Sequence, residues 1–260
     1  LNRKIIHTTI SHILQHFIIV ASSYFKGSRV GFHIAAKEGQ LDNTIIEKFL
    51  DRLSKINRDD VGIHSFTTDD AKWESVVELD SFFEDVIVCR DFDEFEEVLK
   101  SDLKLSAVDV AKFFLAIRPI SHLQLQKLVY LAYKTYLVKY RCPLFDEKIV
   151  AYQYGPVVEE VYQKFKKYGS ETIEIDDRTE YILKDIHLSQ AIGRMLLVKD
   201  AEKIVPTLLD VIKKYGNLSA RQLVDLTHSP EGPWDTVFKR YMNCIITDEI
   251  IISQAIHEKL

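Results

Sequence analysis

Two groups of residues in this chain have the side-chain types that a metal site or a catalytic site would need. His12 and His16 are four residues apart, a spacing that would place both imidazoles on one face of a helix. No third ligand lies near them in the sequence, so we expect no metal site. Asp225, His228 and Ser229 supply the three groups of a nucleophilic triad, but the serine lacks the context of a nucleophile elbow. We interpret these three as polar residues at a helix end.

Other signs of catalysis or of nucleic-acid binding are weak. The glycines occur singly or at turns, and no glycine-rich phosphate loop is present. A formal net charge of −5 gives no electrostatic reason for tight binding to a phosphate backbone. The acidic run 91–100, DFDEFEEVLK, is interpreted as a solvated helix face with its phenylalanines turned inward. We therefore predict no enzyme and no cofactor, and an enzyme built from scattered carboxylates and histidines or a nucleic-acid-binding regulator is left as an alternative.

Composition predicts a globular protein of the cytoplasm. A hydrophobic fraction of 47% with 28% charged residues is enough to bury a substantial core. The three cysteines are far apart and odd in number, which predicts no disulfide framework and favours a reducing compartment. The apolar run Phe17–Phe25 is too short for a membrane span of about 20 residues. We expect no membrane association.

The first hundred residues predict a small α/β domain. Apolar residues from Ile6 to Tyr24 recur at spacings of three and four, which predicts an amphipathic helix that ends before Gly27. Alternation of further helices and strands favours an α/β unit. The remaining predicted elements are strands within 29–36, 61–66 and 85–90, and helices after the capping pair Thr44 and Glu47, around Trp73, and after the capping pair Asp91 and Glu94.

The polar segment 100–104, KSDLK, predicts a domain boundary, and residues 101–260 predict a mainly helical domain. Helix starts are indicated by a serine with a partner three residues later, and helix stops by glycine after Lys-Lys-Tyr. The run 172–183 is typical of a β-hairpin. The predicted fold class is α+β, with domains at 1–100 and 101–260. The expected helix starts are Ser106 with Asp109, Ser121 with Gln124 and Ser219 with Gln222, and the expected stops are Gly169 and Gly216.

Residues 120–169 join several short motifs in one order. A Leu-Gln-Lys-Leu-x-Tyr segment at 125–130 is followed by Pro-Leu-Phe, then Ala-Tyr-x-Tyr-Gly-Pro-Val at 151–157, then Val-Tyr. This order resembles the Panacea domain, also called the SocA-like or phage-associated GepA-like domain, and segments 215–234 and 246–256 continue the likeness. The resemblance covers roughly residues 101–260 and leaves the N-terminal region unrecognised. The residues that match the family signature are Gln126, Lys127, Tyr130, Tyr152, Tyr154, Gly155, Pro156, Val157, Tyr162, Pro233 and Trp234.

The resemblance implies an antitoxin that neutralises a cognate toxin by direct protein contact, with the toxin encoded by an adjacent gene. It also implies an alternative, a phage- or prophage-associated regulator or an adaptor that presents a client to a protease. The second partner would then be that protease.

The residues of the Tyr-Gly-Pro segment predict a sharp turn into a helix. Gly155 permits backbone angles that other residues resist, and Pro156 suits the first position of a helix. Glu159 and Glu160 then fall in the first helical turn, where negative charge is favourable. Tyr152 and its neighbour Tyr154 are expected on one strand face. We interpret this segment as a packing corner, with a contact surface as the alternative.

Three further side chains have two interpretations each. Lys127, among apolar neighbours, either extends to solvent along its stem or hydrogen-bonds the turn at Gly155. Trp234 is expected to anchor a corner of the core. Ile13 and Phe17 lie on the apolar stripe of the first segment, where they either close the domain core or contact the partner. We place partner specificity in this N-terminal segment.

Overall fold

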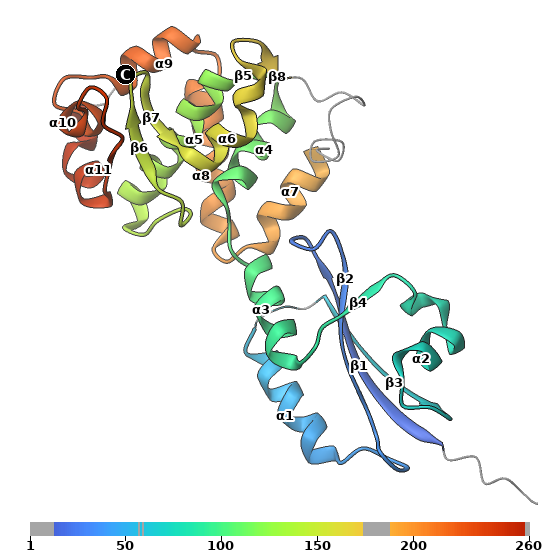
Figure 1. Cartoon of the computed structure of the whole chain (residues 1–260). Coiled ribbons are helices and arrows are strands. Elements are labelled where there is room, and N and C mark those ends of the chain that lie inside the picture. Colours follow the sequence, from blue (N-terminus) through green and yellow to red (C-terminus); the bar gives the residue numbers. More distant parts are fainter. Residues whose placement is uncertain (1–12, 57, 59, 174–187, 258–260) are drawn as a thin grey trace, which may run out of the picture. The chain divides into compact units, whose positions relative to one another are not determined.

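The computed structural model describes residues 13–56, 58, 60–173 and 188–257 (Figure 1). The chain divides into two compact units, residues 1–103 and 104–260. The division falls within the polar segment 100–104. Whether each unit folds by itself stays a prediction.

The first unit is built on a four-stranded sheet. Its strands are β1 (Leu14–Ser23), β2 (Ser28–Ala35), β3 (Val61–Thr68) and β4 (Val86–Val88). Their order in the sheet is β3-β1-β2-β4, with β1 antiparallel to both neighbours and β4 parallel to β2 (Figure 1). Ile19 of β1 lies opposite Phe32 of β2 and Ile63 of β3. β1 and β2 are therefore the central strands, and β3 and β4 are the edges.

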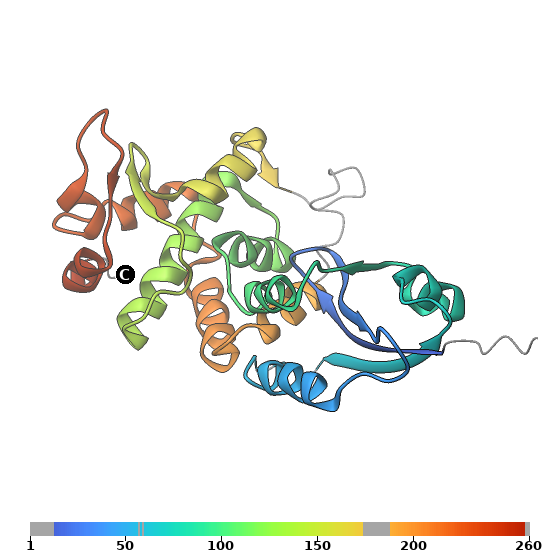
Figure 2. The same cartoon turned by 60° about the horizontal axis from the view of Figure 1, so that its bottom comes forward.

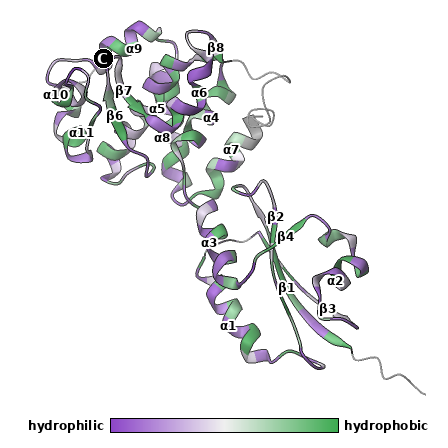
Figure 3. Cartoon of the chain, in the orientation of Figure 1, coloured by the Kyte–Doolittle hydropathy of each residue, from purple (hydrophilic) through white to green (hydrophobic). Residues whose placement is uncertain are grey.

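Helices cover both faces of this sheet. They are α1 (Asn43–Ser54), α2 (Trp73–Leu79), the short 3-10 turn η1 (Ser81–Phe83) and α3 (Phe92–Asp102). Phe17 and Ile19 pack in one apolar cluster with residues of α1 and α3, and Ile18 and Val20 pack in another with α2 and η1. Figures 1 and 2 show α1 and α2 on opposite sides of the sheet. Figure 3 shows polar and apolar residues alternating along α1, as expected of a helix with one buried face.

Strand β1 contradicts the amphipathic helix predicted for Ile6 to Tyr24. The beginning of that prediction, with Ile6 and Ile10, lies outside the described residues. Residues 17–20, Phe-Ile-Ile-Val, are all buried. Such a run needs apolar neighbours on two opposite sides, which a central strand between two helical layers supplies. The spacing of three and four was uninformative because nearly every residue in the run is apolar.

The other elements predicted for the first unit are confirmed, since β2, β3, β4, α1, α2 and α3 lie at the predicted places. The cap of α1 differs from the prediction. Asp42 is the N-cap and accepts a hydrogen bond from the Thr44 backbone N–H, so the capping pair of Thr44 and Glu47 is wrong. Asp91 caps α3 as predicted and accepts from the Glu94 backbone N–H at 2.9 Å.

The second unit is mainly helical and centres on α5 (His122–Tyr140), most of which is buried. The observed fold class is α+β, as predicted. Two small antiparallel sheets accompany the helices, one with the order β7-β6-β9 and one joining β5 to β8. The strands are β5 (Ile120–Ser121), β6 (Ile149–Tyr152), β7 (Gly155–Val158), β8 (Thr172–Ile173) and β9 (Cys244–Ile245). The other helices are α4 (Ala107–Ile117), α6 (Glu159–Phe165), η2 (Lys166–Tyr168), α7 (Leu188–Leu197), α8 (Ala201–Tyr215), α9 (Ala220–Thr227), α10 (Pro233–Val237), α11 (Asp248–Gln254) and η3 (Ala255–His257).

The helix starts predicted for this unit are confirmed. Ser106, Ser121 and Ser219 each form a full capping box with the residue three positions later. Gly169 ends η2 with a φ of 54°, as expected, whereas Gly216 ends α8 in right-handed geometry. The hairpin predicted for 172–183 lies largely outside the described residues. In the described ranges, no helix is both long and apolar enough to cross a membrane.

Candidate functional site

The signature residues of the second unit meet where α5 contacts the hairpin of β6 and β7. Gln126 accepts a hydrogen bond through its side-chain carbonyl from the Val158 backbone N–H at 3.1 Å. Lys127 Nζ donates to the Pro156 carbonyl at 2.9 Å. Both side chains are buried, and Lys127 has no exposed surface. The interpretation in which Lys127 bonds to the turn is therefore confirmed, and the one in which it extends to solvent is wrong.

Gly155 occupies a position that disfavours any other residue for two independent reasons. Its φ is 99°, a backbone angle that L side chains rarely adopt. A Cβ at this position would also lie 2.7 Å from Lys127 Nζ and 3.0 Å from both Thr227 Oγ1 and His228 Nε2. The missing side chain thus lets polar groups of α5 and of the end of α9 approach the same point of the hairpin.

The sequence predicted that Pro156 begins a helix, and this prediction is wrong. Pro156 lies in β7 opposite Ala151, and α6 begins only at Glu159. Because β7 is an edge strand, the missing N–H of a proline is tolerated there. Glu159 and Glu160 lie in the first turn of α6, as predicted.

The signature tyrosines differ in their positions and burial. Tyr152 ends β6 and Tyr154 lies exposed in the following turn, so the two do not share a strand face. The Tyr152 hydroxyl donates to Glu159 Oε1 at 2.8 Å, and burial together with this bond raises the pKa of Tyr152 to about 12. Its ring lies 5.6 Å from that of Tyr162. Two other signature residues, Tyr130 and Val157, are buried in the core.

Trp234 joins the C-terminal helices to this hairpin. It follows Pro233 in the first turn of α10, and both residues are buried. The indole Nε1 donates to the Tyr152 carbonyl at 2.8 Å. Its ring stacks on His228 and on Phe238, with centroid distances of 3.7 and 4.4 Å. The predicted role as a corner anchor agrees with these contacts.

His228 is a titratable residue of this cluster with a shifted pKa. Burial lowers the pKa of His228, and the charge of Lys127 lowers it further. The ring is therefore neutral at pH 7, which allows it to lie near a buried ammonium group. Its Nε2 atom is buried and has no hydrogen-bond partner among the described residues. The Ser229 hydroxyl donates to the Leu226 carbonyl at 2.7 Å, so it gives no nucleophile for His228 to activate.

The histidines of the first unit form a hydrogen-bonded pair. His16 bonds through Nδ1 to His33 Nε2 and through Nε2 to Thr68 Oγ1, each at 2.8 Å. Burial lowers the pKa of both histidines, that of His33 to about 4. His12, the second histidine of the metal pair considered from the sequence, lies outside the described residues. In the part of the chain that the structure describes, no three His, Cys, Asp or Glu side chains are arranged around a common metal position.

The two residues considered as partner contacts differ in their exposure to solvent. Ile13 is exposed, so its contact role stays a prediction. Phe17 is buried beneath α1 and α3 in the core of the first unit. Its predicted contact with a partner is therefore wrong, and the alternative of core packing holds. The residue before Phe17, His16, is buried toward the other face.

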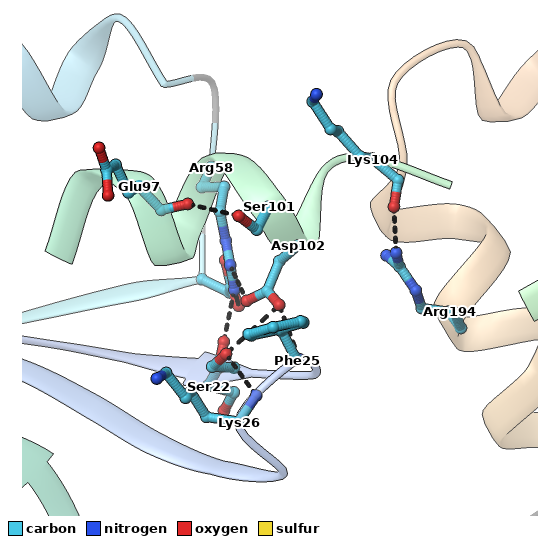
Figure 4. A network of polar contacts seen from close by, with 11 residues as sticks. Ser22, Phe25, Lys26, Arg58, Glu97, Ser101, Asp102, Lys104 and Arg194 are labelled. Atoms are coloured by element: carbon cyan, nitrogen blue, oxygen red, sulfur yellow. Dashed lines mark hydrogen bonds and ion pairs between the residues drawn. The ribbon is translucent and has the colours of Figure 1, made fainter. Parts of the chain in front are cut away.

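Asp102 holds a buried ion pair in the segment that the sequence marked as a polar boundary. Its Oδ2 lies 2.9 Å from Arg58 Nη1, and the two side chains are 2% and 4% exposed. Its Oδ1 accepts from the Phe25 backbone N–H at 2.8 Å and from the Ser23 hydroxyl at 3.3 Å (Figure 4). Arg58 also donates to the Ser22 carbonyl at 2.7 Å. This network closes the first unit, and no local spacing in the sequence indicated it.

A second buried ion pair lies within the second unit. Arg194 Nη2 of α7 lies 3.2 Å from Asp109 Oδ2 of α4, and both side chains are buried. Arg194 also donates to the Lys104 carbonyl (Figure 4). Asp109 thus completes a capping box and neutralises a buried guanidinium at the same time.

Sequence reasoning missed Thr227 and the structural role of His228. Both lie beside Gly155, but they are far from it in the chain, and His228 was considered only as part of a triad. The one available signal was the downstream segment 215–234, which matched the family pattern without indicating what it contacts.

Comparison with known proteins agrees with the sequence pattern. Residues 125–235 match the family described as "Antitoxin SocA-like, Panacea domain". The chain is similar to Antitoxin SocA of Caulobacter vibrioides (strain NA1000 / CB15N), with 33% identity over 120 residues, which is 46% of this chain and 60% of that protein. The match thus spans less than two thirds of this curated relative. No solved structure matches the chain. The Panacea domain predicted from the sequence for roughly residues 101–260 is confirmed over residues 125–235, with an N-terminal region that stays unrecognised.

Proposed function

We propose that this chain is an antitoxin that neutralises a cognate toxin by direct protein contact and performs no chemistry of its own. The observation that carries the proposal is the match of residues 125–235 to the Antitoxin SocA-like, Panacea domain. The similarity to Antitoxin SocA gives it further support over 120 residues.

The use of the signature residues favours a binding scaffold over a catalytic site. Three signature side chains form hydrogen bonds with backbone carbonyl and N–H groups of the hairpin, namely those of Lys127, Gln126 and Trp234. Catalytic groups, by contrast, need to reach a bound reactant. A cavity of about 290 Å³ between α5 and α8 is lined by Asp210 and three lysines and by no histidine. None of the signature residues lines this cavity.

The proposed partner is a toxin encoded by an adjacent gene, met in the cytoplasm. In one version of this function the contact itself blocks the toxin. In another, the complex is handed to a protease, and the chain acts as an adaptor. The two versions differ in what happens to the toxin, because only the second shortens its lifetime.

Co-expression with the protein of the adjacent reading frame tests the proposal. We expect that protein alone to arrest growth, and the full chain to restore growth and to elute with it as one complex in size-exclusion chromatography. Growth arrest that the chain does not relieve would overturn the antitoxin role. Rescue with rapid loss of the toxin, reversed in a strain without the protease, would select the adaptor version.

A further inference from the structure

The outer edge of β3 is an unprotected strand edge. Natural sheets protect their edges with charged side chains, proline, bulges or very short strands, because a free edge pairs readily with another chain. β3 has eight residues, Val61–Thr68, and contains no charged residue and no proline. The opposite edge strand, β4, has only three residues. Among the described residues of the first unit, the sheet is thus protected at one edge and open at the other.

The register of the sheet identifies which β3 residues face outward. The carbonyl of Gln15 in β1 accepts from the Ala36 backbone N–H, which lies on the β2 side. Backbone groups alternate sides along a strand, so the next residue, His16, bonds toward β3, where Phe66 is opposite. Phe66 and every second residue from it therefore pair with β1. The residues that turn N–H and C=O outward are Val61, Ile63, Ser65 and Thr67.

These outward groups are open to a partner. Among the hydrogen bonds of the described residues, none joins them to another segment. The Ile63 side chain is 51% exposed, and the side chains of Ser65 and Thr67 are exposed as well. An open hollow of about 430 Å³ adjoins the second half of the strand and is lined by Ser65, Phe66, Thr67, Gln15, Gln40 and Leu79. An added strand would find free backbone partners and room for a side chain.

Charge distinguishes between two possible occupants of this edge, a second copy of this chain and a cationic partner. Residues 1–103 carry 19 Asp and Glu against 12 Lys and Arg, whereas residues 104–260 carry 20 against 22. Asp60 precedes β3 directly and pairs with Arg58, and Asp69 and Asp70 follow it, with Asp70 3.4 Å from Lys72. A second copy paired antiparallel would place Asp60 against Asp69 and Asp70 and bring two acidic units together. Like charges across a strand pair are unfavourable, so the edge suits a cationic partner.

We propose that the β3 edge of the first unit binds the toxin by strand addition, and that the added toxin segment is an extended, apolar strand with Lys or Arg at its ends. Main-chain hydrogen bonds to the outward residues supply the attachment, and the excess of carboxylates in the first unit favours the basic flanks. The inference rests on the proposed function and assigns the contact surface that this function needs.

Amide exchange followed by NMR tests the alternating geometry. We expect the N–H groups of Ile63, Ser65 and Thr67 to exchange at least about tenfold more slowly in the complex with the co-expressed toxin than in the free chain. His64 and Phe66, whose N–H groups already bond to β1, serve as internal controls and should change little. Binding that leaves the exchange of all five amides unchanged would overturn the inference.

A proline substitution tests the backbone bond itself. Ser65→Pro removes an outward N–H but no bond to β1, whereas Ser65→Ala keeps that N–H. Both lose the 3.1 Å hydrogen bond from Gln15 Nε2 to the Ser65 hydroxyl, so the alanine variant is a matched control. We expect Ser65→Pro to raise the Kd for the toxin about tenfold over Ser65→Ala, with equal melting temperatures. Equal Kd values in two folded variants would contradict strand addition.

A pair of charge variants tests the partner's chemistry and does not depend on tolerance of proline. Ile63→Lys and Ile63→Glu both place a long charged side chain at an exposed position of the edge. Against a basic strand, the lysine variant should bind the toxin more weakly than the glutamate variant, and the difference should shrink at high salt. The reverse order, or no difference, would overturn the cationic assignment.

Two results separate this inference from the function on which it rests. If the wild-type chain fails to rescue growth, the antitoxin role and the edge assignment are both overturned. If the wild type rescues growth and all four variants rescue it equally, the antitoxin role stands and the edge assignment is overturned. A wild-type dimer in light scattering that Ser65→Pro converts to a monomer would assign the edge to a second copy.

Discussion

The ammonium nitrogen of Lys127 lies 2.7 Å from the point where any residue other than glycine at position 155 would place its Cβ. The same nitrogen donates to the carbonyl of the next residue, Pro156. The Gln-Lys motif of α5 and the Tyr-Gly-Pro motif of the hairpin are therefore two sides of one contact. A substitution in either motif should therefore alter the packing of the other.

A side chain at Gly155 should destabilise the second unit. We expect Gly155→Ala to lower the free energy of unfolding by at least about 1–3 kcal/mol, because the positive φ is strained and Lys127 must also move. Gly169→Ala is the matched control, since its φ is also positive but a Cβ there meets no atom within 4 Å. Chemical denaturation measures both. Equal losses would mean that the contact with Lys127 contributes nothing.

Removing the Lys127 charge should raise the pKa values of two histidines. The Lys127 charge lowers the pKa of both His228 and His122, in each case as the second cause after burial. In Lys127→Met, NMR titration should find both pKa values higher than in the wild type. His33, in the first unit, is the internal control. Unchanged titration of His122 and His228 would show that the ammonium does not act on these rings.

The Arg58–Asp102 pair should be important for the stability of the first unit. Asp102→Asn removes the carboxylate from a guanidinium that is 4% exposed. Breaking such a pair costs about 3–5 kcal/mol, and we expect the lower end because Asp60 still pairs with Arg58. The control is Asp93→Asn, whose carboxylate is 78% exposed beside Arg52 and should matter by less than about 1 kcal/mol. Similar losses in the two variants, measured by urea denaturation, would contradict the buried pair.

The first unit should lose stability as the pH falls below neutrality. The pKa of His33 is lowered from 6.5 to about 4 in the folded chain, first by burial and then by His16. Between these pH values the unfolded chain binds more protons, so the free energy of unfolding falls as the pH falls through this window. His33→Gln should show a smaller loss between pH 7 and pH 5 than the wild type. An identical loss would show that His33 is not the titrating group.

Residues 104–260 should fold without the first unit. All members of the large apolar core cluster lie between Leu105 and Ile251. A chain that begins at Lys104 also keeps the carbonyl to which Arg194 donates and the capping box of Ser106. We expect a single cooperative thermal transition in calorimetry, at a higher temperature than for a chain that begins at Ala107. A broad, non-cooperative transition for residues 104–260 would contradict two independent units.

Local bonds could be predicted from the sequence, and distant ones could not. The capping boxes of Ser106, Ser121 and Ser219 were predictable because donor and acceptor are three residues apart. Strand β1 was not, because a run of consecutive apolar residues satisfies helical spacing as well as burial in a sheet. The contacts of Trp234 with Tyr152, of His228 with Gly155 and of Arg58 with Asp102 depend on how elements far apart in the chain pack, and residue spacing does not reveal them. Pro156 was misplaced because an edge strand tolerates proline as well as a helix start does.

The burial of Lys127 also bears on the order in which the second unit assembles. An ammonium group loses its water favourably only when acceptors replace it, so the Pro156 carbonyl favours the burial of this face of α5. The hairpin of β6 and β7, in turn, reaches its final form only with Gly155 against that nitrogen. The docking of α5 and of the hairpin is therefore mutually dependent, and in a chain halted before the hairpin has been synthesised the Lys127 ammonium lacks its Pro156 acceptor.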